Sequence, residues 1–359
     1  LGDKCNVKIP SYRPDIEGEA DLVEEILRIY GYDKIVPQSV TKDSKAKNEV
    51  LDDNLKAFYR SKRIIASRGY LETVTWSFTS YDQTRIENKK DSVKIKNPIS
   101  SDLDTMRSSI FPNLLNSINT NISHLFNNGK LFEVGPQFSG TKENDQQMMG
   151  TGIMYGSFNT DNWNDEKRTS DVFDVKSDVY FILDQLNVPI GSIMHEDTTN
   201  NFFHPGKSAQ LKIGKNTIAN FGEIHPYVLQ KFDIKTNVGG FEIFLDILGQ
   251  FQLKKTSTKK AYDSNTLQVV ERDFAFLFPK NIKAGEIINK IKEIDKQLVK
   301  KVTIFDVFEG NKLPENLKSI AFKVILQPIE KTFTDEEIEK ISNKIIDLIS
   351  KTFEGKLRQ

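Results

Sequence analysis

The sequence predicts an α+β protein of at least two compact units, and three observations support this prediction. Its 359 residues exceed the length of one average domain, so two or three separate cores are expected. In the middle of the chain, predicted strands outnumber predicted crossover helices and short turns join neighbouring strands, which is typical of an antiparallel sheet. After residue 262 the predicted elements follow the order β-α-β-β-α-β, which places two helices on one face of a single sheet.

The composition excludes several classes of function. The 50 Lys and Arg residues balance 50 Asp and Glu residues, which argues against a protein that coats polyanions with its whole surface. Cys5 is the only cysteine, so an internal disulfide framework and a cysteine-rich zinc site are excluded. No apolar run approaches the roughly 20 residues of a membrane helix. We therefore expect a cytoplasmic protein without membrane contact, and the initial Leu1 indicates the carboxy-terminal part of a longer chain.

The first 80 residues are predicted to hold two strands and two helices around a linker. A strand at 5–12 is followed by an acidic stretch and then by a helix at 21–30 that ends at Gly31. The polar segment 36–50 lacks periodicity and is interpreted as a linker. The remaining elements are a helix at 51–68, which stops before Gly69, and a strand at 71–78.

The middle block is predicted to combine further strands with helices that pack against them. Alternation and β-branched residues indicate the strands, and apolar residues at helical spacing indicate the helices. The strands are expected at 92–98, 130–138, 148–156, 208–214 and 217–224, and the helices at 107–126, 171–187 and 226–231.

A basic stretch at 251–262 marks a boundary, because the composition changes there abruptly. The elements beyond it are a strand at 267–278, a helix at 284–298, strands at 301–310 and 319–328, a helix from Thr334, and a short extended piece at 356–359. Glu337 follows Thr334 at the third position, which is the spacing of a capping box. This order predicts a ferredoxin-like unit.

Four carboxylates near the first helix allow two interpretations. Asp21 can cap the helix while Glu24 reaches back to its first turn or pairs with Arg28. Alternatively, Asp21, Glu24 and Glu25 rise on one side of the helix and Asp15 approaches from the preceding segment. An all-oxygen set of this kind suits Mg²⁺ or Ca²⁺. Residue types alone favour the structural interpretation.

At this point a resemblance to a known family becomes clear. The segment "VKIPSYRPDIEGEADLVEEILRIYGYDKI" resembles the PSxRxDIxxxxDLxEExxRxYGYxxI signature of the β subunit of bacterial phenylalanine–tRNA ligase. "NPISSDLDTMRSSIFPNLL", "KLFEVGPQF", "FFHPGKSAQL" and "FGEIHPYVLQKFDI" resemble landmarks of its class II synthetase-like domain. "ERDFAFLF", "IFDVFEG", "KSIAF" and "KTFTDEEI" are similar to its anticodon-binding domain. The resemblance covers nearly the whole chain.

The resemblance implies a domain organisation, a metal and partners. Residues 1–40 correspond to the end of a small metal-binding domain, 41–250 to a noncatalytic class II-like domain, 251–262 to a linker and 263–359 to the anticodon-binding domain. The acidic set Asp15, Asp21, Glu24 and Glu25 is implied to bind Mg²⁺. The partners implied are a catalytic α subunit that uses ATP, in an assembly of two α and two β subunits, and tRNA specific for phenylalanine.

The chain itself is expected to be inactive. Adenylation needs positioned arginines for the ATP phosphates. At 132–135 the sequence offers "FEVG", with an acid and a glycine, and Arg107 is better interpreted as one half of a structural ion pair. Helices 51–68 and 107–126 can contact the α subunit or pack within this chain, and the sequence leaves both possibilities open.

In the last unit, the free face of the sheet is expected to read unstacked anticodon bases by stacking and edge hydrogen bonds. Arg272, Lys318 and Arg358 match family landmarks and are the predicted RNA contacts. The leading hypothesis is therefore a noncatalytic subunit that holds the α subunit and binds tRNA. The alternative is a stand-alone nucleic-acid-binding or regulatory module built from the same domains.

Overall fold

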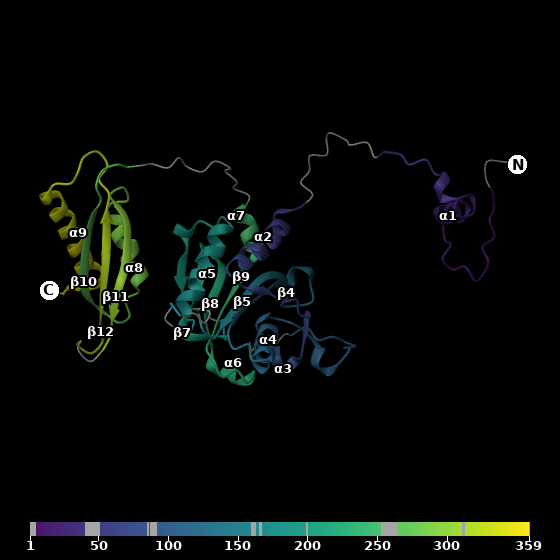
Figure 1. Ribbon diagram of the computed structural model, residues 1–359, viewed down its shortest axis with the longest axis horizontal. Coiled ribbons are helices and arrows are strands. Elements are labelled where there is room, and N and C mark those ends of the chain that lie inside the picture. The colour runs from purple at the N-terminus through teal and green to yellow at the C-terminus, as the bar shows by residue number, and fades with distance from the viewer. Residues whose placement is uncertain are drawn as a thin grey trace. The chain divides into compact units, whose positions relative to one another are not determined.

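The structure is a computed structural model that describes residues 5–39, 51–84, 86, 92–158, 163–164, 167–198, 200–252, 265–310 and 313–358 (Figure 1). The chain divides into two compact units, Leu1–Lys255 and Thr256–Gln359, here called unit 1 and unit 2. Among the described residues, no helix combines the length and the apolar character needed to cross a membrane.

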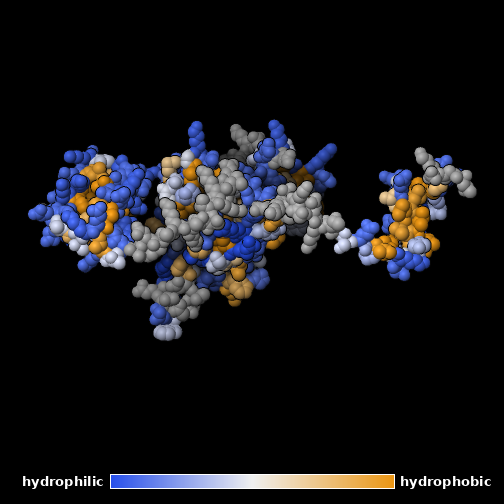
Figure 2. All heavy atoms as spheres, turned by 90° about the horizontal axis from the view of Figure 1, so that it is seen from above, coloured by the Kyte–Doolittle hydropathy of each residue, from blue (hydrophilic) through white to orange (hydrophobic). Residues whose placement is uncertain are grey.

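The N-terminal segment of unit 1 contains helix α1 (Glu19–Tyr30) and a short 3-10 helix η1 (Tyr32–Lys34). Helix α1 ends, as predicted, at Gly31, whose φ of 107° favours glycine. None of its residues is buried, and Val23, Ile26 and Ile29 leave an apolar stripe exposed on this segment (Figure 2). The predicted strand at 5–12 was wrong, because these residues are exposed and form no strand pairing. Of the predicted linker 36–50, residues 36–39 have no regular structure and 40–50 lie outside the described residues.

A seven-stranded sheet forms the centre of unit 1, with the order β1-β4-β5-β9-β8-β7-β6. All neighbours in it are antiparallel except β1 and β4, so the prediction of a largely antiparallel sheet is confirmed. Its strands are β1 (Leu71–Glu72), β4 (Gly129–Phe138), β5 (Gln146–Tyr155), β6 (Met194–Glu196), β7 (Phe203–Ile213), β8 (Asn216–Ile224) and β9 (Val238–Phe244), and a separate pair is formed by β2 (Phe78–Thr79) and β3 (Thr105–Met106).

Helices cover both faces of this sheet (Figure 1). They are α2 (Asp53–Ser67), α3 (Tyr81–Thr84), α4 (Phe111–Ser123), α5 (Val172–Gln185), α6 (Pro226–Lys231) and α7 (Leu245–Gln252). Apolar residues of α2, α5 and α7, such as Ile65, Val179 and Leu248, form one core with Phe132 and Phe241 of the sheet. A second core joins α4 and α6 to the opposite face, with Phe111, Leu115, Val228, Met149 and Ile153 among its members. The sheet is therefore buried on both sides.

The middle block departs from the prediction in four places. Only the ends of the predicted strand 71–78 are paired, because Thr75 donates its backbone N–H to the Glu133 carboxylate instead of to a neighbouring strand. The predicted strand 92–98 is reduced to a single bridge between Lys94 and Thr105. The helix predicted at 107–126 begins only at Phe111, because the backbone N–H of Arg107 still donates to the Ser77 carbonyl, and it ends at Ser123. Strands β3, β6 and β9 and helices α3 and α7 had no counterpart in the prediction.

Unit 2 has the predicted order of elements. These are β10 (Val270–Pro279), α8 (Ala284–Ile294), β11 (Val299–Phe308), β12 (Leu317–Leu326), α9 (Asp335–Phe353) and β13 (Lys356–Leu357), and the strands form an antiparallel sheet in the order β11-β12-β10-β13. The predicted capping box is present at Thr334 and Glu337. Phe276 and Phe322 stack with ring centroids 5.8 Å apart and pack with Ile287 of α8 and Ile345 of α9. One face of the sheet thus carries both helices.

Candidate functional site

The acidic residues beside α1 are engaged by arginines and by the backbone. Arg13 donates to Asp15 Oδ2 at 2.7 Å and to Glu25 Oε1 at 2.5 Å, while Arg28 donates to Glu25 Oε2 at 2.7 Å. Asp21 accepts the backbone N–H groups of Glu17 and Gly18, each at 2.8 Å. These hydrogen bonds lower the pKa of Asp15, through Arg13, and the pKa of Asp21, through the backbone.

This arrangement does not fit a magnesium ion. Asp15 and Glu25 share Arg13, and Asp21 binds the start of its own helix, so Asp15, Asp21, Glu24 and Glu25 are not brought together as a ligand set. Within the described part of the chain, no three His, Cys, Asp or Glu side chains gather so that they could hold a metal ion. Binding of Mg²⁺ by the four acids stays a prediction, and it requires Arg13 to leave two carboxylates.

The Glu25 carboxyl group is expected to titrate at about pH 2. Hydrogen bonds from Arg13 and then Arg28 lower its pKa from 4.5 to about 2, because they stabilise the ionised form. The stability that these hydrogen bonds give to the N-terminal segment is therefore complete above pH 4.5 and is lost as the pH falls towards 2. Carboxyl-carbon NMR measures it directly, and Arg13→Gln should move the midpoint back towards 4.5.

One control variant and two possible outcomes show whether arginines or a metal ion neutralise the Glu25 carboxylate. The variant Arg60→Gln, on helix α2, should leave the titration unchanged. A wild-type midpoint near 4.5 contradicts the ion pairs. A shift of the Glu25 resonance on addition of Mg²⁺ at neutral pH would support the metal prediction.

In unit 1, Arg107 forms a buried ion pair, which confirms the structural interpretation of this residue. Its Nη1 lies 2.6 Å from Glu133 Oε1, and the exposed fractions of the two residues are 1% and 5%. Arg107 also donates from Nε to the Pro136 carbonyl at 2.9 Å, and the Thr75 hydroxyl donates to Glu133 Oε2 at 2.6 Å. A Cβ atom at Gly135 would lie 2.5 Å from Arg107 Nη2, so only glycine leaves room for this guanidinium.

The ion pair belongs to a polar row that crosses the sheet. Residues directly opposite one another in an antiparallel sheet share a face. The register pairs Glu133 with Thr151, Thr151 with Glu242, Glu242 with Asn220, and Asn220 with Gln210. Glu242 accepts from Asn220 Nδ2 at 2.8 Å. These row positions carry acids, amides and a hydroxyl, whereas stabilising a transferring phosphoryl group takes cations.

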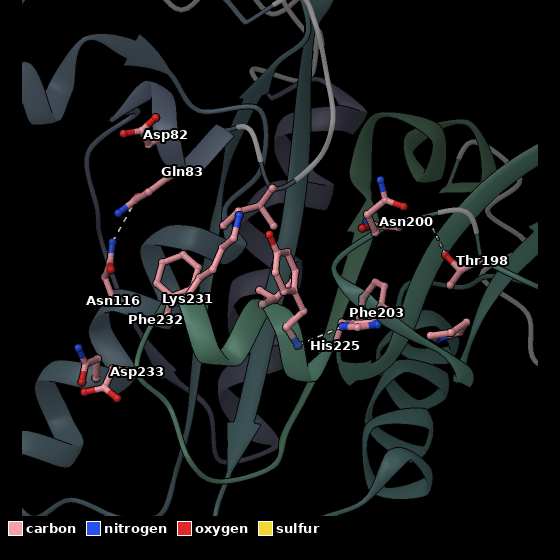
Figure 3. A pocket seen from close by; sticks show the side chains of 16 residues that line it. Asp82, Gln83, Asn116, Thr198, Asn200, Phe203, His225, Lys231, Phe232 and Asp233 are labelled. Atoms are coloured by element: carbon pink, nitrogen blue, oxygen red, sulfur yellow. Dashed lines mark hydrogen bonds between the residues drawn. The ribbon is translucent and has the colours of Figure 1, made fainter.

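A large cleft of unit 1 lies away from this polar row. Helices α3, α4 and α6, together with Thr198 and residues 200–205, line a volume of about 1160 Å³ (Figure 3). Its wall is rich in carboxamides, namely Gln83, Asn116, Asn119, Asn200 and Asn201. His225 lines the cleft and accepts the Tyr227 backbone N–H through Nδ1 at 3.1 Å, which caps α6. None of the predicted site residues is among the described residues that line it.

In unit 2, the three predicted RNA contacts do not share one face of the sheet. Phe274, Phe276 and Phe278 point from β10 into the core. Arg272 is two residues before Phe274 and therefore lies on the same side of the strand. Lys318 is opposite Phe278 and donates to the Lys280 carbonyl at 2.8 Å. Arg272 and Lys318 therefore lie at the ends of the helix-covered face.

Arg358 reaches the other face. Its backbone N–H donates to the Ala275 carbonyl at 2.8 Å, and its Nη1 lies 3.5 Å from the Ser319 hydroxyl. Ser319 is opposite Leu277 of β10, on the side away from Phe276 and Phe278. Within the described part of unit 2, no helix packs its apolar residues against this side, which we call the open face.

The open face also carries residues that the sequence reasoning missed. A bulge between Ile304 and Asp306 shifts the alternation of β11, so that Asp306 is opposite Ala321 and Phe308 is opposite Ser319. The side chain of Phe308 is 39% exposed. The exposed ring of Phe308, the carboxylate of Asp306 and the guanidinium of Arg358 thus lie on one surface, whereas Ser319 is only 2% exposed. A ring, an acid and a cation together suit stacking and edge recognition of unpaired bases.

Comparison with known proteins assigns the class and the family. Three family models match consecutive parts of the chain: a tRNA synthetase B5 domain at 1–32, the phenylalanyl-tRNA synthetase beta chain CLM domain at 37–245, and a ferredoxin-fold anticodon-binding domain at 265–358. The fold and these matches define a polypeptide of the aminoacyl-tRNA synthetase class. The chain belongs to the phenylalanyl-tRNA synthetase beta-chain family, whose model covers more than half of it.

Curated relatives agree with this assignment. The phenylalanine–tRNA ligase beta subunit of Paramagnetospirillum magneticum is 38% identical over 99% of this chain, and that of Bartonella henselae is 37% identical over 99%. The chain spans 45% of the length of each of these relatives. Among solved structures, the pyrrolysyl-tRNA synthetase of Desulfitobacterium hafniense gives a TM-score of 0.42 at 11% identity, over 54% of this chain and 67% of that one, and this likeness carries no argument.

Proposed function

We propose that this chain is a noncatalytic, tRNA-binding part of a phenylalanine–tRNA ligase beta subunit. The match of residues 265–358 to an anticodon-binding domain, on a sheet whose open face carries Phe308 and Arg358, is the observation that carries this proposal. In this function the open face holds the anticodon loop of phenylalanine-specific tRNA, with Phe308 stacking on a base and Arg358 supplying a positive charge.

Unit 1 is the scaffold in this proposal. Its residues 41–250 form a class II synthetase-like domain that has lost its chemistry, and ATP is used in a separate catalytic alpha subunit. Two observations support the loss of chemistry. Glu133 and Gly135 stand on β4 where a phosphate-binding arginine is expected, and Arg107 is engaged in the buried ion pair with Glu133. An assembly of two alpha and two beta subunits in the cytoplasm completes the proposal, and Mg²⁺ would bind Asp15, Asp21, Glu24 and Glu25 of this chain only after Arg13 releases Asp15 and Glu25.

Reconstitution tests the function as a whole. The 359-residue chain is mixed with the alpha subunit of the same organism, and phenylalanylation of tRNA is measured with and without each component. We expect the two chains to purify together and tRNA binding to be specific for phenylalanine tRNA. We expect no charging by this chain alone, because Arg107, the arginine beside the polar row of the sheet, is already paired with Glu133.

The outcomes separate the competing functions. Charging of tRNA by the purified chain alone would overturn the noncatalytic proposal. Failure to associate with the alpha subunit, together with equal affinity for unrelated RNA and duplex DNA, would favour a stand-alone nucleic-acid-binding module.

A further inference from the structure

One buried carboxylate in unit 1 holds two cations that come from distant parts of the chain. Asp178 of α5 is 1% exposed and accepts from Arg68 Nε at 2.7 Å, from the Tyr70 hydroxyl at 3.0 Å and from Lys130 Nζ at 3.2 Å. Burial, and then the charge of Asp178, raise the pKa of Tyr70, so its hydroxyl stays a neutral donor. Two positive side chains are thus fixed by one negative one.

One nitrogen of the Arg68 guanidinium is bound to Asp178, and the other two are available to a ligand. Its Nε is bound to Asp178, and its Cζ lies 4.8 Å from the centroid of the Phe181 ring. Within the described residues, neither η nitrogen of Arg68 has a hydrogen-bond acceptor, and the side chain is 34% exposed. A guanidinium in this state presents two parallel N–H donors in a fixed plane, which matches the two oxygens of a carboxylate or phosphate.

Both cations line a cleft of the size that small ligands use. Arg68 and Lys130 contribute to a cleft of about 410 Å³, together with the aromatic side chains Tyr155 and Phe158 and with Met154. The volume lies in the range of roughly 300–1,000 Å³ typical of small-molecule sites. Lys130 Nζ lies 5.5 Å from the Phe158 ring centroid, and Arg168 Cζ lies 4.1 Å from the same centroid. The part of Phe158 that stays exposed, 38% of the residue, is the apolar surface available beside Lys130.

We propose that this cleft binds a small ligand that carries one carboxylate or phosphate group on a flat apolar body. The oxyanion takes two hydrogen bonds from the Arg68 η nitrogens and a third from Lys130, and the apolar body lies against Phe158, which is 38% exposed. A single-stranded RNA is the less suitable occupant, because its successive phosphates need a track of cations, whereas this cleft offers two cations at one end.

Titration calorimetry on the 359-residue chain tests the proposal with phenyl phosphate, benzoate, inorganic phosphate and the uncharged benzyl alcohol. We expect saturable binding of phenyl phosphate or benzoate, weaker binding of inorganic phosphate, and none of benzyl alcohol. Arg68→Lys keeps the charge and a bond to Asp178 but removes the paired donors. It should therefore weaken binding about tenfold or more, as expected when a charge-assisted bidentate hydrogen bond is lost.

Matched variants keep the test decisive. Arg63→Gln alters an exposed arginine of the same helix α2 and should bind like wild type. Lys130→Gln should also weaken binding, and an unchanged thermal unfolding curve shows that each variant is folded. The proposal is overturned if no acidic probe binds, if Arg68→Lys binds as tightly as Arg63→Gln, or if only an oligoribonucleotide binds in an Arg68-dependent way.

Discussion

Replacing Glu133 by alanine is expected to lower the free energy of unfolding of unit 1 by about 3–5 kcal/mol, since it leaves a buried guanidinium without its counter-ion. Arg107 is 1% exposed and cannot turn to solvent, because the Pro136 carbonyl and Thr75 hydroxyl hold it in place. Urea unfolding followed by near-UV circular dichroism of tyrosine measures the effect, because Tyr70 and Tyr155 belong to unit 1 and are each only 2% exposed.

Two companion variants show whether burial is the cause. Glu196→Ala removes the partner of Lys212 at the exposed end of the same sheet, and it should cost no more than about 1 kcal/mol. The double variant Arg107→Met with Glu133→Leu replaces the pair by apolar groups and should recover most of the loss. Equal costs for Glu133→Ala and Glu196→Ala would show that the buried pair has no special weight.

Replacing Phe308 by alanine is expected to weaken binding of an RNA hairpin with the phenylalanine anticodon loop by about 5- to 150-fold, which corresponds to losing one stacked base at roughly 1–3 kcal/mol. The ring is 39% exposed and lies opposite Ser319 on the open face, so its removal opens no cavity in the core. Fluorescence anisotropy with the labelled hairpin measures the affinity.

A neighbouring residue supplies the control for Phe308. Val307 is also exposed, at 53%, but the register places it opposite Ile320, on the helix-covered side. Val307→Ala should bind the hairpin like wild type. If both variants bind with unchanged affinity, the open face is not the RNA-binding surface.

The helices whose starts were predicted correctly begin at residues that mark a helix start in the sequence itself. Helix α9 begins at a capping box and keeps one apolar stripe, and α6 begins at a proline, so both starts were predicted correctly. Strand β9 and helix α7 were missed because Val238–Phe244 passes into Leu245–Gln252 without a turn residue between them. A continuous apolar run of this kind does not show where the strand stops and the helix starts.

Only some features of the candidate site could be predicted from the sequence. Arg107 as half of an ion pair could be predicted, because a single arginine beside an acidic strand segment has few other partners. The face of the sheet on which Arg272, Lys318 and Phe308 lie could not be predicted, since it depends on the register in which the strands pair. Simple alternation along β11 puts Phe308 in the core with Val302 and Ile304, and only the bulge before Asp306 turns it outward. The bridge that Arg13 makes between Asp15 and Glu25 is a three-dimensional contact that spacing does not reveal.

Gly135 makes the residues around the buried ion pair depend on one another. A larger residue there would meet Arg107 Nη2 already at its Cβ atom, 2.5 Å away, so the guanidinium would have to move. Removing Arg107 would in turn leave Glu133 buried without its counter-ion. Substitutions at positions 107, 133 and 135 are therefore expected to be epistatic, because the effect of each on stability depends on the residues present at the other two.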